Sequence, residues 1–302
     1  MTRHVATRAI AAGNALGEGI VWDTRDQSLY WTDIKAATLW RHCPASGATR
    51  TWPLPEPLGC LALCETDGWL LLGLASRLAF LELATGRIVP ICPVEPGLAT
   101  RINDGACDRE GRFVFGTKHE PPGGGRSAPL GAFYRLDADL SLHRLALGGI
   151  AIANGTAFSP DGRTLYYCDS PTHVIRRCAY TRDGEARDAH DWIDLTAAEG
   201  EPDGSTVDAD GGVWNARWDA GQVVRYDPAG HATDSVAFPV ARPTRPALGG
   251  AGLATLFVTS AQPDAPSDNA GSDAGHVFSA HIAVPGLPEA RFAGKPLHFQ
   301  PT

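Results

Sequence analysis

The amino-acid sequence predicts an all-β protein, a six-bladed β-propeller with four-stranded antiparallel blades. Three observations predict this fold. A pattern of paired short strands recurs six times at nearly even spacing, and no stretch carries the long apolar stripe of an amphipathic helix. The chain is also rich in turn-forming residues, with 34 glycines and 23 prolines among 302 residues. We therefore expect one propeller domain spanning residues 1–302.

Each repeat has a polar turn with glycine, a strand of aromatic and β-branched residues, a loop and a second strand. In chain order, the predicted strand pairs are 28–33 with 38–41, 69–72 with 78–81, 112–117 with 132–136, 164–169 with 174–176, 212–217 with 223–226, and 255–259 with 276–279. Residues 121–127 and 262–274 are predicted to be polar loops within the third and sixth repeats.

The spacing of the repeats decides between two all-β architectures. One anchor from the first strand of each pair (Tyr30, Leu70, Val114, Tyr166, Trp214 and Phe257) gives gaps of 40, 44, 52, 48 and 43 residues. This period matches one four-stranded propeller blade. Two stacked β-sandwiches would not produce one even period along the whole chain, so the propeller is favoured.

Four polar residues occupy the same phase of the repeat, 11 or 12 residues before the anchor. They are Glu18, Asn103, Asn154 and Asp203, and each is followed at once or after one residue by glycine. This phase is the entry to the innermost strand, which lines the central channel of a propeller. Rotational pseudosymmetry then brings the four side chains together at one end of the channel. The other two repeats place Leu58 and Arg245 at this phase, so the ring of oxygen atoms is incomplete there.

Two carboxylates and two carboxamides that converge form a site for a hard cation. Calcium, magnesium and manganese favour such oxygen ligands, and zinc also accepts carboxylates. Asn-Gly and Asp-Gly are equally the strongest hairpin dipeptides, so one pair alone would indicate only a turn. Four pairs at one phase of a repeat favour the metal site.

Composition and charge exclude several classes of function. The formal charge of −8 provides no basic field for phosphate backbones, so no nucleic acid partner is expected. No apolar run reaches the roughly 20 residues of a membrane helix, and the first 17 residues lack a signal-peptide core. We expect no membrane partner and a cytoplasmic protein. The seven cysteines form no C-x-x-C pair and are expected to be reduced thiols, mostly buried.

Several motifs, taken together and in this order, resemble a known superfamily. They are LGEGIVW at 16–22, RINDG at 101–105 with GRFVFGT at 111–117, IANG at 152–155 with SPDGRTLYY at 159–167, and PDG at 202–204 with GGVW at 211–214. They resemble the superfamily of senescence marker protein (regucalcin), gluconolactonase and luciferin-regenerating enzyme. The resemblance extends from about residue 16 to residue 279.

The resemblance implies a six-bladed propeller that holds one divalent metal ion (Ca, Zn, Mg or Mn) near the channel mouth and hydrolyses a sugar-acid lactone. It implies Glu18, Asn154 and Asp203 as metal ligands, with Asp203 also as the catalytic acid and base. Arg101 and Asn103 match positions that bind the sugar lactone. The family's next acidic position, after GT at 116–117, is replaced here by KHEP at 118–121, where Glu120 is the nearest candidate for a substrate contact.

These residue types are sufficient for lactone hydrolysis. Ring opening needs a water nucleophile, stabilisation of the carbonyl oxygen and a proton for the leaving alkoxide. The sequence contains no G-x-S-x-G elbow, the motif that would indicate a serine hydrolase. The expected partner is a small-molecule sugar lactone, either D-gluconolactone or a pentonolactone such as L-arabinonolactone, and the expected protein is a monomer or small homo-oligomer. Two alternatives stay open, namely a propeller hydrolase of other esters, such as organophosphates, and a non-catalytic calcium-binding propeller.

Overall fold

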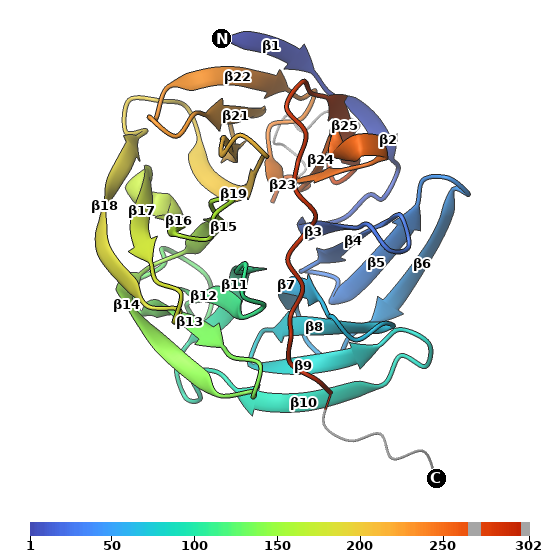
Figure 1. Ribbon diagram of the computed structural model, residues 1–302, viewed down its shortest axis with the longest axis vertical. Coiled ribbons are helices and arrows are strands. Elements are labelled where there is room, and N and C mark those ends of the chain that lie inside the picture. Colours follow the sequence, from blue (N-terminus) through green and yellow to red (C-terminus); the bar gives the residue numbers. More distant parts are fainter. Residues whose placement is uncertain (265–272, 297–302) are drawn as a thin grey trace.

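Six sheets form a ring in the computed structural model, which describes residues 1–264 and 273–296 (Figure 1). The predicted six-bladed propeller is therefore confirmed. Helical structure in the described residues is limited to two single 3₁₀ turns, η1 (Ser170–Thr172) and η2 (Ala251–Leu253). Within this part of the chain, no helix has the length and apolar character that a membrane crossing needs.

Four blades are continuous four-stranded meanders in chain order. Blade 1 contains β3 (Gly17–Asp23), β4 (Ser28–Asp33), β5 (Thr38–Cys43) and β6 (Ala48–Pro53). Blade 2 contains β7 (Leu58–Leu63), β8 (Trp69–Leu74), β9 (Arg77–Glu82) and β10 (Ile88–Pro93). Blade 3 contains β11 (Thr100–Cys107), β12 (Phe113–His119), β13 (Gly131–Leu136) and β14 (Leu142–Ile150). Blade 4 contains β15 (Ala153–Phe158), β16 (Thr164–Asp169), β17 (Val174–Tyr180) and β18 (Ala186–Asp194).

The N-terminal strands complete the last two blades. Blade 5 contains β19 (Glu201–Val207), β20 (Val213–Trp218), β21 (Gln222–Tyr226) and β22 (Ala232–Ala237), with β1 (Thr2–Val5) added in parallel at its outer edge. Blade 6 contains β23 (Pro243–Gly249), β24 (Thr255–Ser260) and β25 (Val277–His281), and β2 (Thr7–Ile10) is its fourth strand. The two ends of the ring are thus joined by strand pairing, which closes the propeller.

The predicted strand pairs correspond to the second and third strands of each blade. The spans 28–33 and 164–169 coincide with β4 and β16, and the other predicted spans differ from the observed strands by one to four residues at their ends. The loop predicted at 121–127 connects β12 and β13. The loop predicted at 262–274 lies between β24 and β25, and its residues 265–272 are outside the described part of the chain.

Each innermost strand contains a register shift near its start. In β3 the pairing with β4 shifts between Glu18 and Val21, and in β15 the pairing with β16 shifts between Asn154 and Ala157. The other four inner strands shift at the equivalent place. Gly19 and Gly155 supply the left-handed backbone there, with φ of 59° and 68°. Because such bulges redirect side chains, they set the direction of the residues beside them.

Packing between neighbouring blades forms the core. The largest fully buried side chains are aromatic, and they lie on faces where one blade meets the next. Between blades 2 and 3, for example, Phe80, Phe113 and Phe115 belong to one buried cluster. All seven cysteines are free, and four of them are buried, as the sequence predicts.

The C-terminal strap, residues 282–296, runs across the ring (dark red in Figure 1). Its backbone hydrogen-bonds to blade 6 at Leu253, to blade 2 at Leu63 and to blade 3 at Gly111, just before β12. Its Phe292 is fully buried and packs on Phe80, with ring centroids 6.0 Å apart. The strap therefore links blades that are distant in the sequence.

Candidate active site

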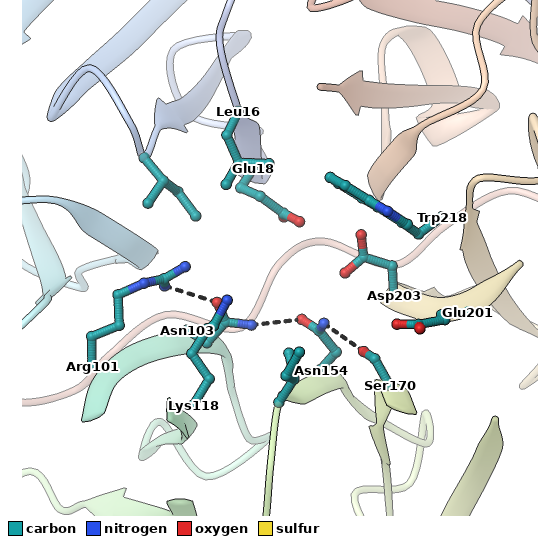
Figure 2. A pocket seen from close by; sticks show the side chains of 12 residues that line it. Leu16, Glu18, Arg101, Asn103, Lys118, Asn154, Ser170, Glu201, Asp203 and Trp218 are labelled. Carbon is teal, nitrogen blue, oxygen red and sulfur yellow. Dashed lines mark hydrogen bonds between the residues drawn. The ribbon is translucent and has the colours of Figure 1, made fainter. Parts of the chain in front are cut away.

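A cavity of about 230 Å³ lies at one mouth of the channel. Figure 2 shows Glu18, Asn103, Asn154 and Asp203 facing one another around it. They come from β3, β11, β15 and β19, the innermost strands of four different blades. The complete lining is Leu16, Glu18, Ile34, Arg101, Asn103, Lys118, Ile152, Asn154, Ser170, Glu201, Asp203 and Trp218. The structure thus brings together the four side chains that share one phase of the repeat.

A chain of hydrogen bonds fixes one wall of the cavity (dashed lines in Figure 2). Arg101 Nη1 donates to Asn103 Oδ1 at 2.8 Å, and Asn103 Nδ2 donates to Asn154 Oδ1 at 2.9 Å. Asn154 Nδ2 then donates to Ser170 Oγ, which itself donates to the Pro202 carbonyl oxygen, both at 2.8 Å. The chain fixes the orientation of both amides and connects blades 3, 4 and 5.

Glu18 and Asp203, two of the three carboxylates that line the cavity, are held without a cationic partner. No ion pair among the described residues involves Glu18 or Asp203. The surrounding protein removes water from the Glu18 carboxylate and raises its pKa from 4.5 to about 7, although the charge of Arg245 opposes this shift. Burial and the facing Glu18 charge raise the pKa of Asp203 well above its usual range.

This donor set fits a divalent cation. Among the described residues, no group of three or more His, Cys, Asp and Glu side chains is placed to hold a metal ion. The cavity instead brings the Glu18 and Asp203 carboxylates together with the amide oxygen of Asn154, which keeps a lone pair beside its bond from Asn103. A bound cation would offset the mutual repulsion that raises the pKa of Asp203. Oxygen donors of this kind suit Ca²⁺, Mg²⁺, Mn²⁺ or Zn²⁺.

Glu120 lies at the edge of the cavity and does not line it. Its side chain is 60% exposed, and its Oε1 is 3.3 Å from Nε of the buried Arg101. Arg101 itself is a cavity residue, 6% exposed, and also donates to the Ile102 carbonyl oxygen at 3.0 Å. Glu120 is therefore a partner of Arg101 at the rim of the cavity.

Seven residues of the lining have no role predicted from the sequence, and four of these are polar or aromatic. They are Lys118 of β12, Ser170 of η1, Glu201 of β19 and Trp218 of β20. Glu201 had a usable signal, because it lies two residues before Asp203 on one strand and so shares its face. Ser170 follows a strand end with no motif, and only the fold reveals it.

The fold and the cavity together define the class, a six-bladed β-propeller with a carboxylate-bearing pocket at its channel mouth. The family model described as "SMP-30/Gluconolactonase/LRE-like region" matches residues 16–262, and the chain belongs to this family. The family resemblance read from the sequence is thereby confirmed.

Two curated relatives and one solved structure are similar over nearly their full lengths. L-arabinolactonase of Azospirillum brasilense is 49% identical over 294 residues, covering 96% of both chains. The 6-deoxy-6-sulfogluconolactonase of Pseudomonas putida is 36% identical and covers 93% of this chain and 96% of the relative. The structure titled as a calcium-binding protein, regucalcin, from Agrobacterium tumefaciens has a TM-score of 0.89 at 29% identity, covering 97% of this chain and 99% of that one.

Proposed function

We propose that this chain is a hydrolase of sugar-acid lactones that depends on one divalent metal ion. The observation that carries the proposal is the meeting of Glu18, Asn154 and Asp203 with Arg101 and Asn103 around a single cavity. Two relatives named as lactonases, matched over nearly the whole chain, support the same reaction class.

Glu18, Asn154 and Asp203 are the proposed metal ligands, one from each of three inner strands. When bound, a divalent cation supplies Lewis-acid chemistry, either at the lactone carbonyl or at a water molecule. Asn215 supports the Asp203 backbone, because its buried Nδ2 donates to the Asp203 carbonyl oxygen at 2.9 Å. The ligand from blade 5 is therefore held by a side chain of the adjacent strand β20.

Asp203 is the proposed acid and base. Its carboxylate takes a proton from the attacking water, and the same group returns a proton to the ring oxygen as the carbon–oxygen bond breaks. Arg101 and Asn103 orient the lactone through hydrogen bonds to its oxygen atoms, and Glu120 holds the guanidinium of Arg101 in place from the rim. A lactone is an activated ester, so no covalent nucleophile is required.

A pentonolactone is the substrate that we propose first, because the relative named L-arabinolactonase is 49% identical. D-Gluconolactone is the second candidate. Both are neutral sugar lactones with several hydroxyl groups, and the cavity offers Arg101, Asn103 and Glu201 to hydrogen-bond them.

The test is proton release from L-arabinono-1,4-lactone, D-glucono-1,5-lactone, a phenyl ester and an organophosphate triester. Each substrate is tried after chelation and again with added Ca²⁺, Mg²⁺, Mn²⁺ or Zn²⁺. We expect turnover of a sugar lactone only with a divalent ion. Preference for the phenyl ester or the triester would indicate the alternative ester hydrolase. Calcium binding without turnover of any substrate would indicate a non-catalytic propeller, and either result overturns the proposal.

A further inference from the structure

Two basic residues lie directly opposite each other on neighbouring strands of blade 3. Arg101 of β11 pairs with Lys118 of β12 in an antiparallel ladder, and both side chains line the cavity. Residues that are directly opposite share one face of the sheet, and like charges there are destabilising. A destabilising pair of like charges in the wall of a cavity indicates that function requires at least one of them.

The two cations differ in their partners. Arg101 is close to the Glu120 carboxylate, at 3.3 Å, and donates to Asn103 Oδ1 at 2.8 Å. Lys118 forms no ion pair with any residue in the described ranges 1–264 and 273–296. Figure 2 shows its side chain extended toward the centre of the cavity. The ammonium group therefore points into the cavity and has no carboxylate within ion-pair distance.

Lys118 is the cation of the lining that has no carboxylate partner among the described residues. Glu18, Glu201 and Asp203 are the carboxylates of the lining, a bound divalent ion would balance Glu18 and Asp203, and Glu120 offsets Arg101. Burial and the neighbouring Arg101 lower the pKa of Lys118 from 10.5 to about 8, and Glu120 and Asp203 oppose this shift. The ammonium is consequently still mostly protonated near pH 7.

The reaction creates negative charge that such a cation can stabilise. In lactone hydrolysis the water oxygen bonds to the carbonyl carbon, the bond from that carbon to the ring oxygen breaks, and the ring oxygen receives a proton. The carboxylic acid that forms then loses a second proton to solvent, which leaves a carboxylate. Negative charge thus grows on the oxygen atoms of the carbonyl carbon from substrate to product.

On the basis of the proposed function, we propose that Lys118 is a further catalytic residue that contacts the lactone. Its ammonium donates a hydrogen bond to the carbonyl oxygen and then pairs with the carboxylate of the open-chain sugar acid. The contact strengthens as the oxygen becomes anionic, so it acts on kcat more than on KM. Neither the shared repeat phase nor the family motifs assign a role to this residue.

The test uses three variants of the metal-loaded protein: Lys118→Met, Lys118→Arg and the control Lys295→Met. Lys295 is exposed on the C-terminal strap, outside the cavity. We expect Lys118→Met to lower kcat for the preferred lactone by roughly 10- to 100-fold, the range of one charge-assisted hydrogen bond. Lys118→Arg keeps a substantial part of the rate, and Lys295→Met matches the wild type.

A second readout is independent of turnover, namely calorimetric binding of the sugar acid, such as L-arabinonate. We expect Lys118→Met to weaken this binding by about 10-fold or more, and Lys118→Arg to retain it. Thermal unfolding checks the fold, and because Lys118→Met removes a repulsion with Arg101, we expect no loss of stability.

The outcomes separate the two proposals. An active wild type whose Lys118→Met variant keeps the wild-type kcat and sugar-acid affinity overturns the role of Lys118 alone. A wild type that turns over no lactone overturns the proposed function, and the binding of the sugar acid then decides on Lys118. A wild type that neither hydrolyses lactones nor binds the sugar acid overturns both.

Discussion

Asp104 and Arg245 form a buried ion pair across the central channel, joining blade 3 to blade 6. Asp104 is the neighbour of the cavity residue Asn103, and its second oxygen accepts a hydrogen bond from the Thr156 backbone of blade 4 at 2.7 Å. The Arg245 side chain also packs against Gly204, where a Cβ atom would lie only 2.8 Å away. The pair thus holds four blades together beside the proposed metal ligands.

Removing one member of this pair leaves an uncompensated buried charge. We expect Arg245→Met to lower the free energy of unfolding by about 3–5 kcal/mol, measured by urea denaturation. The double variant Asp104→Asn/Arg245→Met recovers part of that loss, because no charge is left unpaired. The exposed Arg126→Met serves as the control and keeps the wild-type midpoint. Equal midpoints for Arg245→Met and the control would contradict a structural role for the pair.

Variants of Asp203 and Glu201 distinguish the proposed acid–base role from a general effect of negative charge in the cavity. Both carboxylates line it from the same strand. We expect Asp203→Asn to lower kcat by at least about 100-fold, since proton transfer contributes this much to catalysis. Glu201→Gln keeps most of the rate. If Glu201→Gln lowered kcat as much as Asp203→Asn does, the assignment of the acid–base role to Asp203 alone would be wrong.

The proposed metal ligands predict a dependence on added ions. Chelation is expected to abolish lactone hydrolysis, and one of Ca²⁺, Mg²⁺, Mn²⁺ or Zn²⁺ restores it. Glu18→Gln weakens the binding of that ion at least about 10-fold in calorimetry, because a charged ligand is lost. Glu120→Gln is the matched control, since Glu120 lies at the rim and not in the lining. Unchanged ion affinity in Glu18→Gln removes Glu18 from the ligand set.

Arg101 is expected to act mainly on substrate binding. Its guanidinium orients Asn103 and opens onto the cavity, so Arg101→Met loses contacts made in both the ground state and the transition state. We expect KM for the lactone to rise about 10-fold or more, with a smaller change in kcat, in steady-state kinetics. Glu120→Gln loosens Arg101 and raises KM less. A fall in kcat at constant KM would instead assign Arg101 to the chemical step.

The C-terminal strap predicts a stability effect far from the cavity. Phe292 is fully buried against Phe80 between blades 2 and 3. We expect Phe292→Ala to cost about 3–5 kcal/mol in urea unfolding. Leu130→Ala is the control, because that side chain is 48% exposed and its truncation leaves no buried cavity. A cost below that of the control would show that the strap is dispensable.

The sequence predicts the fold and the convergence of the inner-strand residues because both follow from one repeat. Glu18, Asn103, Asn154 and Asp203 share a phase, so a single architectural rule places them together. The repeat does not predict the N-terminal strands β1 and β2, because each pairs with a strand that lies more than 230 positions away. The repeat also does not predict Lys118 and Ser170 as cavity residues. Their position at the cavity depends on where strands end and not on the phase of the repeat.

The ion pair of Asp104 and Arg245, each about 95% shielded from solvent, also lies across the channel next to the proposed metal ligands. We therefore expect a ligand to enter and leave the cavity by the same mouth of the channel. In the proposed hydrolysis, the opened sugar acid would therefore have to leave before the next lactone could bind.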